Sequence, residues 1–305
     1  MNVSVVICTF NRCDSLKMTL NGLRKLKSNH EMTWEVVVVD NNSTDSTKAV
    51  VLEFQSDSYF HLRYVFEKEQ GLSHARNRGV KEAEGEIIAF TDDDVVVDGN
   101  WLNNIWSAFH TGNAACIGGR IFPVWEIPRP DWLQPELHNY LALLDMGDEV
   151  VRLNRASIWG ANFSVKADCF RKYGVFNTDI GRKPGKLYAG EETVFIQKII
   201  DGGEEVYYHP DIIVHHYIPK SRIRKEYFKR WKYDEGELNA LKMGSYRSRN
   251  IMGIPLYAIR ETIELYFRML WGRMKNKDTS FKDELLLAKY LGFAIGRVRY
   301  KYNKL

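Results

Sequence analysis

Apolar runs alternate with amphipathic segments over the first 120 residues of the chain. Each run is short and mostly apolar, as expected for a strand that is buried on both faces of a sheet, and the segments between the runs have helical periodicity. This alternation predicts an α/β fold in which a mainly parallel, Rossmann-like sheet is flanked by helices. The expected strands span 3–10, 34–39, 62–66, 86–90 and 114–122.

Polar residues at the starts of the amphipathic segments are candidates for helix caps. Asp14 is the candidate for the first helix. Asn42 and Ser43 are the candidates for a second helix, which we expect to run to residue 54. Further helices are expected at 73–83 and 98–110.

The pattern changes after residue 122. Residues 123–150 are rich in Pro, Trp and acidic residues, and we interpret them as a loop-rich excursion that shapes part of a binding site. Regular signals return as a segment at 157–165, a helix start at 190–200 and a strand at 206–216. Beyond residue 219 the chain becomes helical, with one amphipathic stripe made of Leu256, Ile259, Ile263, Phe267 and Leu270.

Charge divides the chain at about the same place. Residues 1–219 carry 22 Lys and Arg against 30 Asp and Glu, a balance of −8, whereas residues 220–305 carry 21 against 9, a balance of +12. We therefore expect one domain over 1–219 and a helical basic C-terminal extension over 220–305. The acidic part is suited to metal chemistry, and the basic part faces an anion or is a solvated surface.

Cysteine usage and hydropathy exclude several classes of protein. The four cysteines are scattered without a C-x-x-C pair, so a zinc ribbon or a disulfide framework is not expected, and a reduced, cytoplasmic chain is the simplest interpretation. The opening apolar run is interpreted as a strand and not as a signal peptide. Charged residues interrupt the longest apolar stretch, 251–271, so it is not an ordinary membrane span.

Three consecutive acids, Asp92, Asp93 and Asp94, follow the fourth expected strand. Alternate carboxylates of a D-x-D sequence point the same way from extended backbone, and such oxygen ligands suit Mg²⁺ or Mn²⁺, which also bind phosphate. The alternative is an acidic loop that caps the next helix.

Other polar residues fall at the same expected sheet edge, where α/β proteins bind ligands. Asp40 ends the second strand, where its carboxylate can accept from a base N–H. Arg76 lies in a helix that starts near residue 73, and a helix N-terminus with Arg nearby suits a diphosphate. Each feature alone is more often an ordinary cap or turn, but their convergence on one edge favours a ligand site. The polar residues that leave the first strand are Thr9, Asn11 and Arg12.

Six motifs in order carry a resemblance to a known family. They are V-S-V-V-I-C-T-F-N-R, V-V-V-V-D-N-N-S-T-D, G-L-S-H-A-R-N-R-G, A-F-T-D-D-D, W-G-A-N-F and G-E-E-T. Each is weak alone, but the ordered set resembles the family-2 inverting glycosyltransferases with a GT-A fold, over about residues 3–236. The resemblance implies transfer of a sugar from a nucleotide-diphosphate donor to an acceptor hydroxyl in polysaccharide or glycoconjugate synthesis.

The resemblance also implies roles for the residues at the sheet edge. Thr9 and Asp40 would contact the nucleotide, a UDP-sugar, and Asp92 would lie near the ribose. Asp94 would bind Mn²⁺ or Mg²⁺, and the Arg76 helix would lie near the donor. We group Asn11, Arg12 and Asp93 with these donor contacts.

The same resemblance places the general base at the start of a helix. The family usually has a Glu-Asp pair there, whereas this chain has Glu191 and Glu192. An inverting transfer is a single displacement, in which a carboxylate takes the proton of the attacking hydroxyl. Glu192 is in the Asp position and is the expected base, with Glu191 in reserve. Acidic residues that favour a helix N-terminus are the alternative.

Two further pairs of residues have both structural and functional interpretations. His215 and His216 end the expected strand at 206–216, where an imidazole completes the metal shell, touches the diphosphate, or is structural. Trp159 and Asn162 line the acceptor site in one interpretation. In the other, the Trp is a core residue.

Competing functions lack their own motifs. A dinucleotide-binding G-x-G-x-x-G and a P-loop are absent from the sequence. A nucleotidyltransferase would have a Gly-rich basic loop after its first strand, which 9–12 does not resemble. A non-catalytic sugar-nucleotide or glycan-binding module remains the alternative from another class. Such a module is expected to lack some of the catalytic acids, whereas this chain has Asp94, Glu191 and Glu192.

The basic extension suggests an anionic partner. Dense basic runs beside aromatic residues, at 222–232 and 297–304, favour reversible binding to an anionic membrane surface on the cytoplasmic face, where a lipid-linked acceptor would be presented. Nucleic acid is not expected, because no recognition motif is present. The open alternative is that these helices pack on the catalytic domain or form a homodimer.

Overall fold

The computed structural model describes residues 1–27, 32–56, 59–182, 185–244, 249–274 and 281–302. Chain contacts divide the protein into two units, one of residues 1–184 with 190–220 and the other of residues 185–189 with 221–305. Residues 185–189 lie inside the predicted 1–219 domain, yet they belong to the second unit.

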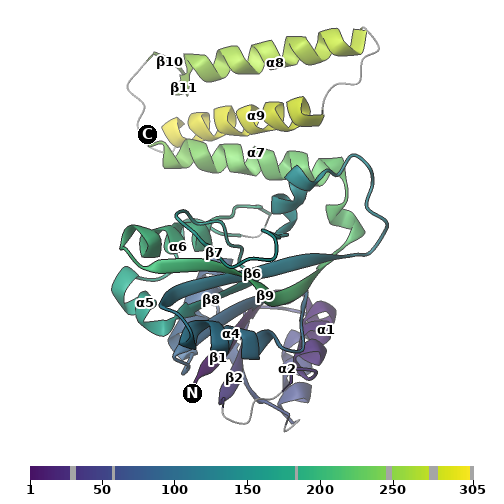
Figure 1. The fold of residues 1–305 in the computed structure, drawn as a ribbon. Helices are drawn as coiled ribbons and strands as arrows, with labels where there is room; N and C mark the ends of the chain where they lie inside the picture. Colours follow the sequence, from purple (N-terminus) through teal and green to yellow (C-terminus); the bar gives the residue numbers. More distant parts are fainter. Residues whose placement is uncertain (28–31, 57–58, 183–184, 245–248, 275–280, 303–305) are drawn as a thin grey trace. The chain divides into compact units, whose positions relative to one another are not determined.

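Four parallel strands form one half of the sheet in the first unit, in the order β3-β2-β1-β4. Helices connect them and cover them, which confirms the predicted α/β fold (Figure 1). The strands are β1 (Val3–Thr9), β2 (Trp34–Asp40), β3 (His61–Phe66) and β4 (Ile87–Asp92), and the helices are α1 (Cys13–Leu23), α2 (Thr47–Gln55) and α3 (Leu72–Glu82).

The other half of the sheet is mixed, so the sheet is less parallel than expected. β8 (Asn162–Lys166) runs antiparallel between β4 and β6 (Ala114–Trp125), while β6 pairs in parallel with β9 (Glu205–Ile218). β5 (Val95–Val97) and β7 (Val151–Arg152) pair antiparallel with β9. The sheet is flanked here by α4 (Trp101–His110), α5 (Ala167–Tyr173) and α6 (Glu191–Asp201), and a 3₁₀ helix spans Pro135–Leu141.

Two predicted helix starts are wrong. Helix α2 begins at Thr47, because Asn42 adopts a left-handed backbone with φ 66° and Ser43 is engaged elsewhere. The Ser43 amide donates to Asp40 Oδ1 at 2.9 Å, and its hydroxyl accepts the Asn11 amide at 2.9 Å. Helix α1 begins one residue before Asp14, which lies in its first turn. The loop after β2 is thus bound to the end of β1.

Stacked aromatic rings fill the core beneath the mixed half of the sheet. Phe90 of β4 stacks on Phe163 of β8 with ring centroids 4.7 Å apart, and Phe170 of α5 stacks on Phe195 of α6 at 4.5 Å. Phe176 packs edge-on against Phe90. The core therefore ties α5 and α6 to the two central strands, which fixes the start of α6 relative to the sheet.

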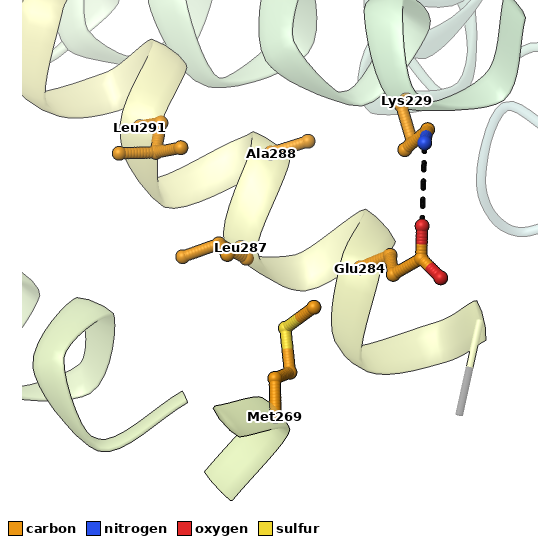
Figure 2. Close-up of a pocket in the computed structure, with 6 residues that line it drawn as sticks. All are labelled: Lys229, Met269, Glu284, Leu287, Ala288 and Leu291. Carbon is orange, nitrogen blue, oxygen red and sulfur yellow. Dashed lines mark hydrogen bonds and ion pairs between the residues drawn. The ribbon is translucent and has the colours of Figure 1, made fainter. Parts of the chain in front are cut away.

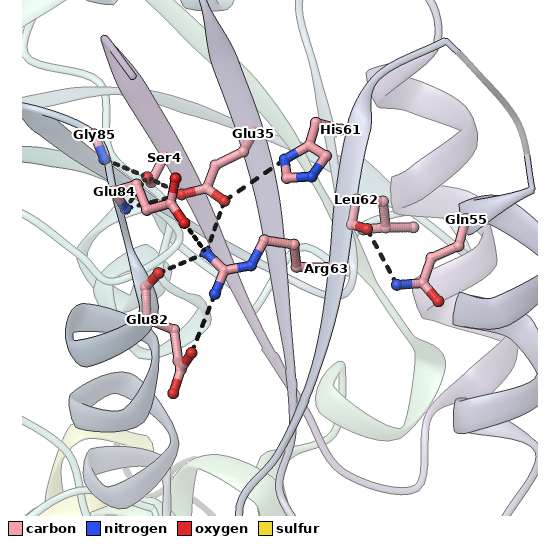
Figure 3. Close-up of polar contacts among 9 residues, drawn as sticks. All are labelled: Ser4, Glu35, Gln55, His61, Leu62, Arg63, Glu82, Glu84 and Gly85. Atoms are coloured by element: carbon pink, nitrogen blue, oxygen red, sulfur yellow. Dashed lines mark hydrogen bonds and ion pairs between the residues drawn. The ribbon is translucent and has the colours of Figure 1, made fainter.

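A buried carboxylate joins β1, β2 and β3 near their amino-terminal ends (Figure 3). Glu35 of β2 is fully buried and accepts hydrogen bonds from Ser4 Oγ at 2.6 Å and from the Glu84 amide at 2.9 Å. Arg63 of β3 pairs with it at 3.0 Å. Burial alone would raise the pKa of Glu35, but these hydrogen bonds and the charge of Arg63 lower it below its usual value.

The second unit is a helical bundle of α7 (Lys225–Lys242), α8 (Leu256–Met274) and α9 (Phe281–Tyr302) with a short hairpin of β10 (Asn250–Ile251) and β11 (Ile254–Pro255). Glycines allow α7 and α9 to approach closely, since a Cβ on Gly236 would lie 2.0 Å from the Lys289 carbonyl oxygen and one on Gly292 would lie 1.9 Å from that of Tyr233. The pair α7 and α9 is the core of this unit.

Buried acids of α7 hold residues 185–189 in the second unit. Asp234 and Glu237 are both nearly inaccessible to solvent. The Leu187 amide donates to Asp234 Oδ2 at 2.9 Å, and Lys186 pairs with both acids. Tyr188 donates to Glu237 Oε2 at 3.1 Å.

Helix α8 packs on α9 through a face that the sequence did not indicate. Ala258, Leu265 and Met269 are buried, whereas most of the predicted stripe is exposed. A small groove of about 190 Å³ lies beside Met269. Lys229 of α7 and Glu284 of α9 line it and form an ion pair of 3.3 Å (Figure 2). Among the described helices, none is long and apolar enough to cross a membrane.

Replacement of Arg63 by Met tests the buried carboxylate. The change leaves Glu35 buried without its cation, and we expect the free energy of unfolding to fall by about 2–3 kcal/mol, less than for a fully enclosed pair because Arg63 is partly exposed. Because the pKa of Glu35 is depressed, its contribution is present above its usual pKa and disappears as pH falls through the lowered value.

The matched control is Lys17→Met, which removes the exposed pair of Lys17 with Glu53. This variant should stay within about 1 kcal/mol of wild type in urea unfolding followed by circular dichroism. Equal stability of the two variants would show that the pairing of Arg63 with Glu35 contributes nothing.

Candidate active site

The carboxyl ends of β1, β2 and β4 bring the predicted polar residues to one edge of the sheet. Thr9 and Asp40 are paired in register at the ends of β1 and β2, and Asp92 lies beside Cys8 at the end of β4. The first two side chains are buried, whereas about one third of the Asp92 side chain is exposed. The edge therefore gathers both enclosed and accessible oxygen atoms, as a ligand site requires.

Arg12 binds two consecutive carboxylates. Its guanidinium lies 2.6 Å from Asp93 Oδ1 and 2.7 Å from Asp94 Oδ2. Thr9 donates its hydroxyl to Asp93 Oδ2 at 2.7 Å. Burial raises the pKa of Asp93 to about 7, with Arg12 opposing the shift. Both carboxylate oxygens of Asp93 are thus bound by protein groups, Thr9 and Arg12, so this side chain stabilises the edge of the sheet.

Asp94 and His216 form the part of the edge best suited to a metal ion. His216 Nε2 lies 3.2 Å from Asp94 Oδ1, and both side chains are buried. No group of three His, Cys, Asp or Glu arranged for a metal occurs in the described ranges. A carboxylate and an imidazole can together bind a divalent transition-metal ion such as Mn²⁺, which would complete its shell with phosphate and water oxygens.

His215 does not join this pair. Successive residues of a strand point to opposite faces, and His215 stacks on Phe122 with ring centroids 6.0 Å apart. Its predicted place in the metal shell is not met in this structure.

Asp40 is positioned by its neighbours at the end of β2. Its Oδ1 accepts the Ser43 amide, and its Oδ2 accepts the Tyr64 hydroxyl at 2.8 Å. Asn11 adopts a left-handed backbone and accepts the Thr44 amide at 2.7 Å. These bonds join the loops after β1 and β2 into one wall of the site.

Arg76 is a buried cation among three acids. Its guanidinium lies 2.5 Å from Glu191 Oε1, 3.7 Å from Glu192 Oε2 and 3.9 Å from Asp92 Oδ1. Gly160 lies directly against it, since a Cβ there would lie 2.0 Å from Arg76 Nη2. The arginine predicted to serve the donor therefore contacts the acids predicted to serve the acceptor.

The N-terminus of the Arg76 helix is partly used within the protein. The Gly71 amide donates to Asn41 Oδ1 at 2.8 Å, and the Leu72 amide donates to the Arg182 carbonyl at 3.0 Å. Two of the amides expected to face a diphosphate are thus engaged.

Glu191 and Glu192 open α6 as predicted, and both are buried. Burial, and then the charge of Glu191, raise the pKa of Glu192 to about 7. The Oε2 atoms of both residues are buried without a hydrogen-bond partner among the described residues. Carboxylate oxygens in that state are suited to accept a proton, or a hydrogen bond that a ligand hydroxyl donates.

The two predicted acceptor residues differ in their surroundings. Trp159 is half-buried and donates its indole N–H to the Leu143 carbonyl at 3.1 Å, which leaves part of its ring accessible. Asn162 is fully buried and bonds Trp101, Arg120 and Ile212, all within 3.0 Å. The acceptor role predicted for Asn162 is therefore wrong, because its polar atoms hold the sheet together.

Several residues that shape the site were not predicted. Tyr64 orients Asp40, and Gly160 makes room for Arg76. Gly181, with φ 101°, lies against the acids, since a Cβ there would lie 3.1 Å from Glu191 Oε2. Gly160 could have been noticed within W-G-A-N, but the spacing of Tyr64 and Gly181 gives no signal in the sequence.

Comparison with known families identifies relatives of the chain. The family model described as Glycosyl transferase family 2 matches residues 4–174, more than half of the chain. The Glucosyl-dolichyl phosphate glucuronosyltransferase of Haloferax volcanii is 27% identical over 220 residues, which make up 71% of this chain and 69% of the relative.

Solved structures share the fold. Mannosyltransferase PcManGT from Pyrobaculum calidifontis, in complex with GDP-Man and Mn²⁺, matches with a TM-score of 0.64 at 18% identity, over 97% of this chain and 87% of that one. S. aureus TarS 1-349 in complex with UDP-GlcNAc matches with a TM-score of 0.53 at 17% identity, over 88% of this chain and 72% of that one. The predicted GT-A fold is thereby confirmed.

Substitution of Gly160 by Ala tests the packing around Arg76. The new methyl group overlaps the guanidinium, and we expect the free energy of unfolding to fall by about 1–3 kcal/mol. Gly112→Ala is the control, because a Cβ there meets only ordinary contact at 3.7 Å, and it should change stability by less than about 1 kcal/mol. Thermal unfolding that leaves Gly160→Ala as stable as the control would contradict this packing.

Proposed function

The chain belongs to glycosyl transferase family 2, and we propose that it is an inverting enzyme that transfers a sugar from a UDP-sugar to an acceptor hydroxyl. The observation that carries the proposal is the buried cluster of Arg76, Glu191 and Glu192 at the sheet edge that also holds Asp94. The proposed proton acceptor, Glu192, and the proposed metal ligand, Asp94, thus lie at the same sheet edge.

The donor is proposed to bind along the ends of β1, β2 and β4. The wall made by Asp40, Asn11 and their loop partners suits the nucleoside, and the partly exposed Asp92 suits a ribose hydroxyl. Thr9, Arg12 and Asp93 line the floor, and Arg12 supplies positive charge near the diphosphate. Asp94 and His216 would hold Mn²⁺ or Mg²⁺, which neutralises the charge of the leaving diphosphate.

The acceptor hydroxyl is proposed to give its proton to Glu192 as its oxygen attacks the anomeric carbon. The C–O bond to the diphosphate breaks in the same displacement, which inverts the anomeric centre. Arg76 orients the acids through its bond to Glu191, and Trp159 offers part of its ring to the acceptor sugar. The raised pKa of Glu192 matches a base that works near neutral pH.

The acceptor is proposed to be a glycan or lipid-linked glycan at an anionic membrane surface, as part of glycoconjugate synthesis on the cytoplasmic face. The supporting observations are the +12 balance of residues 220–305 and the glucosyl-dolichyl phosphate in the name of the Haloferax relative.

Release of nucleoside diphosphate from a panel of sugar nucleotides tests the proposal directly. We expect release from at least one UDP-sugar with a divalent ion present. Tight binding without turnover would instead support a non-catalytic module, and release of pyrophosphate from a nucleoside triphosphate and a sugar phosphate would support a nucleotidyltransferase.

Removal of the Asp94 carboxylate tests the metal site. We expect Asp94→Ala to lower ion-dependent turnover by at least about 10²-fold, because the diphosphate charge then lacks its counter-ion. Calorimetric titration with Mn²⁺ should show weaker ion binding. The exposed Asp14→Ala is the control and should behave as wild type. Full activity in excess chelator would refute the metal requirement.

Glu192→Gln tests the base. We expect turnover to fall by about 10²–10⁴-fold with little change in donor binding. In wild type, activity should fall as pH drops through about 7, where Glu192 becomes protonated. Because the charge of Glu191 helps to raise that pKa, Glu191→Gln should move the acid limb of the pH profile to lower pH.

The two variants also decide between the neighbours. An inactive Glu191→Gln beside an active Glu192→Gln would transfer the role of base to Glu191.

A further inference from the structure

One face of α8 exposes a broad apolar surface. About 60% of Phe267 and of Trp271 is accessible to solvent, and the fraction reaches 73% at Met274. Spaced three or four apart along the helix, the residues of this surface lie on one side of it. We call this set the α8 apolar face, and it consists of Ile263, Tyr266, Phe267, Leu270, Trp271 and Met274.

The α8 apolar face is additional to the surface that folds the unit. The opposite side of the same helix already packs on α9 through Ala258, Leu265 and Met269. Figure 1 shows α8 as the outermost helix of the second unit, with α9 between α8 and α7. Large aromatic side chains exposed in this number mark an interaction surface, because exposure of apolar area to water costs free energy.

Two basic side chains accompany the α8 apolar face, Arg260 on the same side of the helix about one turn before Ile263 and Arg268 at the edge of that side. Arg260 and Arg268 are both more than 60% exposed, and each is paired only at the surface, Arg260 with Glu261 and Glu264 of α8 and Arg268 with Asp283. A helix with Trp, Tyr and Phe on one side and Arg on its flank has the composition of a helix that lies in a membrane interface.

We propose that α8 lies in the interface of an anionic lipid bilayer, with Ile263, Phe267 and Trp271 inserted among the acyl chains. Membrane binding itself does not depend on the proposed function. Only its role, which is to bring the enzyme to a lipid-linked acceptor, rests on that function. A bilayer fits better than a second copy of the chain because the unit is strongly basic, so two copies would repel one another.

The basic runs predicted from the sequence contribute less to this surface than expected. Arg297 is buried and donates to the carbonyls of Gly253, Ala240 and Gly244. Arg299 pairs with Glu237. Lys304 lies outside the described residues. Because part of the basic charge is internal, apolar insertion provides most of the binding, and added salt weakens it only in part.

The test uses the full chain and vesicles of phosphatidylcholine with phosphatidylglycerol, without any sugar nucleotide. The variant Ile263→Ser with Phe267→Ser and Trp271→Ser removes the inserted side chains, each of which is at least half exposed. The matched control is Leu52→Ser with Val150→Ser and Val175→Ser, three residues of the first unit that are each about half exposed. Flotation measures the bound fraction at low and high salt.

We expect wild type and the control to float with the vesicles, and the α8 variant to lose at least about tenfold in partition. Wild type should keep part of its binding at high salt. Equal binding of the α8 variant and wild type would overturn the proposal, as would no binding of wild type to anionic vesicles.

Two further measurements distinguish membrane binding from self-association and from loss of function. Light scattering that shows a wild-type dimer and a monomeric α8 variant, without vesicle binding, would assign the face to a second copy and overturn the proposal. Nucleoside diphosphate release by the α8 variant in solution should equal that of wild type, which shows an intact fold. Failure of every chain to release nucleoside diphosphate would refute the enzyme function without touching the vesicle result.

Discussion

The acidic site of the first unit depends on one buried positive charge, the guanidinium of Arg76. Without it, Glu191, Glu192 and Asp92 would place three carboxylates in a region of low dielectric, where like charges repel strongly. The arginine of α3 also joins the end of β4, the next element along the chain, to the start of α6, which is about 100 residues further on. Gly160 leaves the space that this side chain occupies.

Arg12 likewise neutralises two neighbouring carboxylates, those of Asp93 and Asp94, which follow the end of β4. Its fork bonds Asp93 and Asp94 together, so consecutive acids after β4 are held at fixed positions before any donor binds. Both arginines therefore act first as internal counter-ions. A site that is preorganised in this way loses little conformational freedom when a ligand arrives, which is the general advantage of fixed charges in transfer reactions.

Much of this arrangement follows from local sequence patterns, and the rest depends on contacts across the fold. The apolar runs predicted the parallel strands. The polar residues that follow these runs predicted the edge of the sheet where the site lies, because the carboxyl ends of parallel strands meet at one edge. The pattern could not show that β8 enters between β4 and β6, so it misplaced Asn162. It also misjudged α8, which has apolar residues on two sides, since periodicity cannot tell which side finds a partner.

The least predictable feature links the two units through the chain itself. Residues 185–189 are held by Asp234 and Glu237 of α7, and the next three residues are Gly190, Glu191 and Glu192. Gly190, with φ 104°, allows the turn between that held segment and α6. The unit that exposes the α8 apolar face therefore also anchors the chain immediately before the proposed base. Those few residues join the second unit, through the chain itself, to the helix that begins with Glu191 and Glu192.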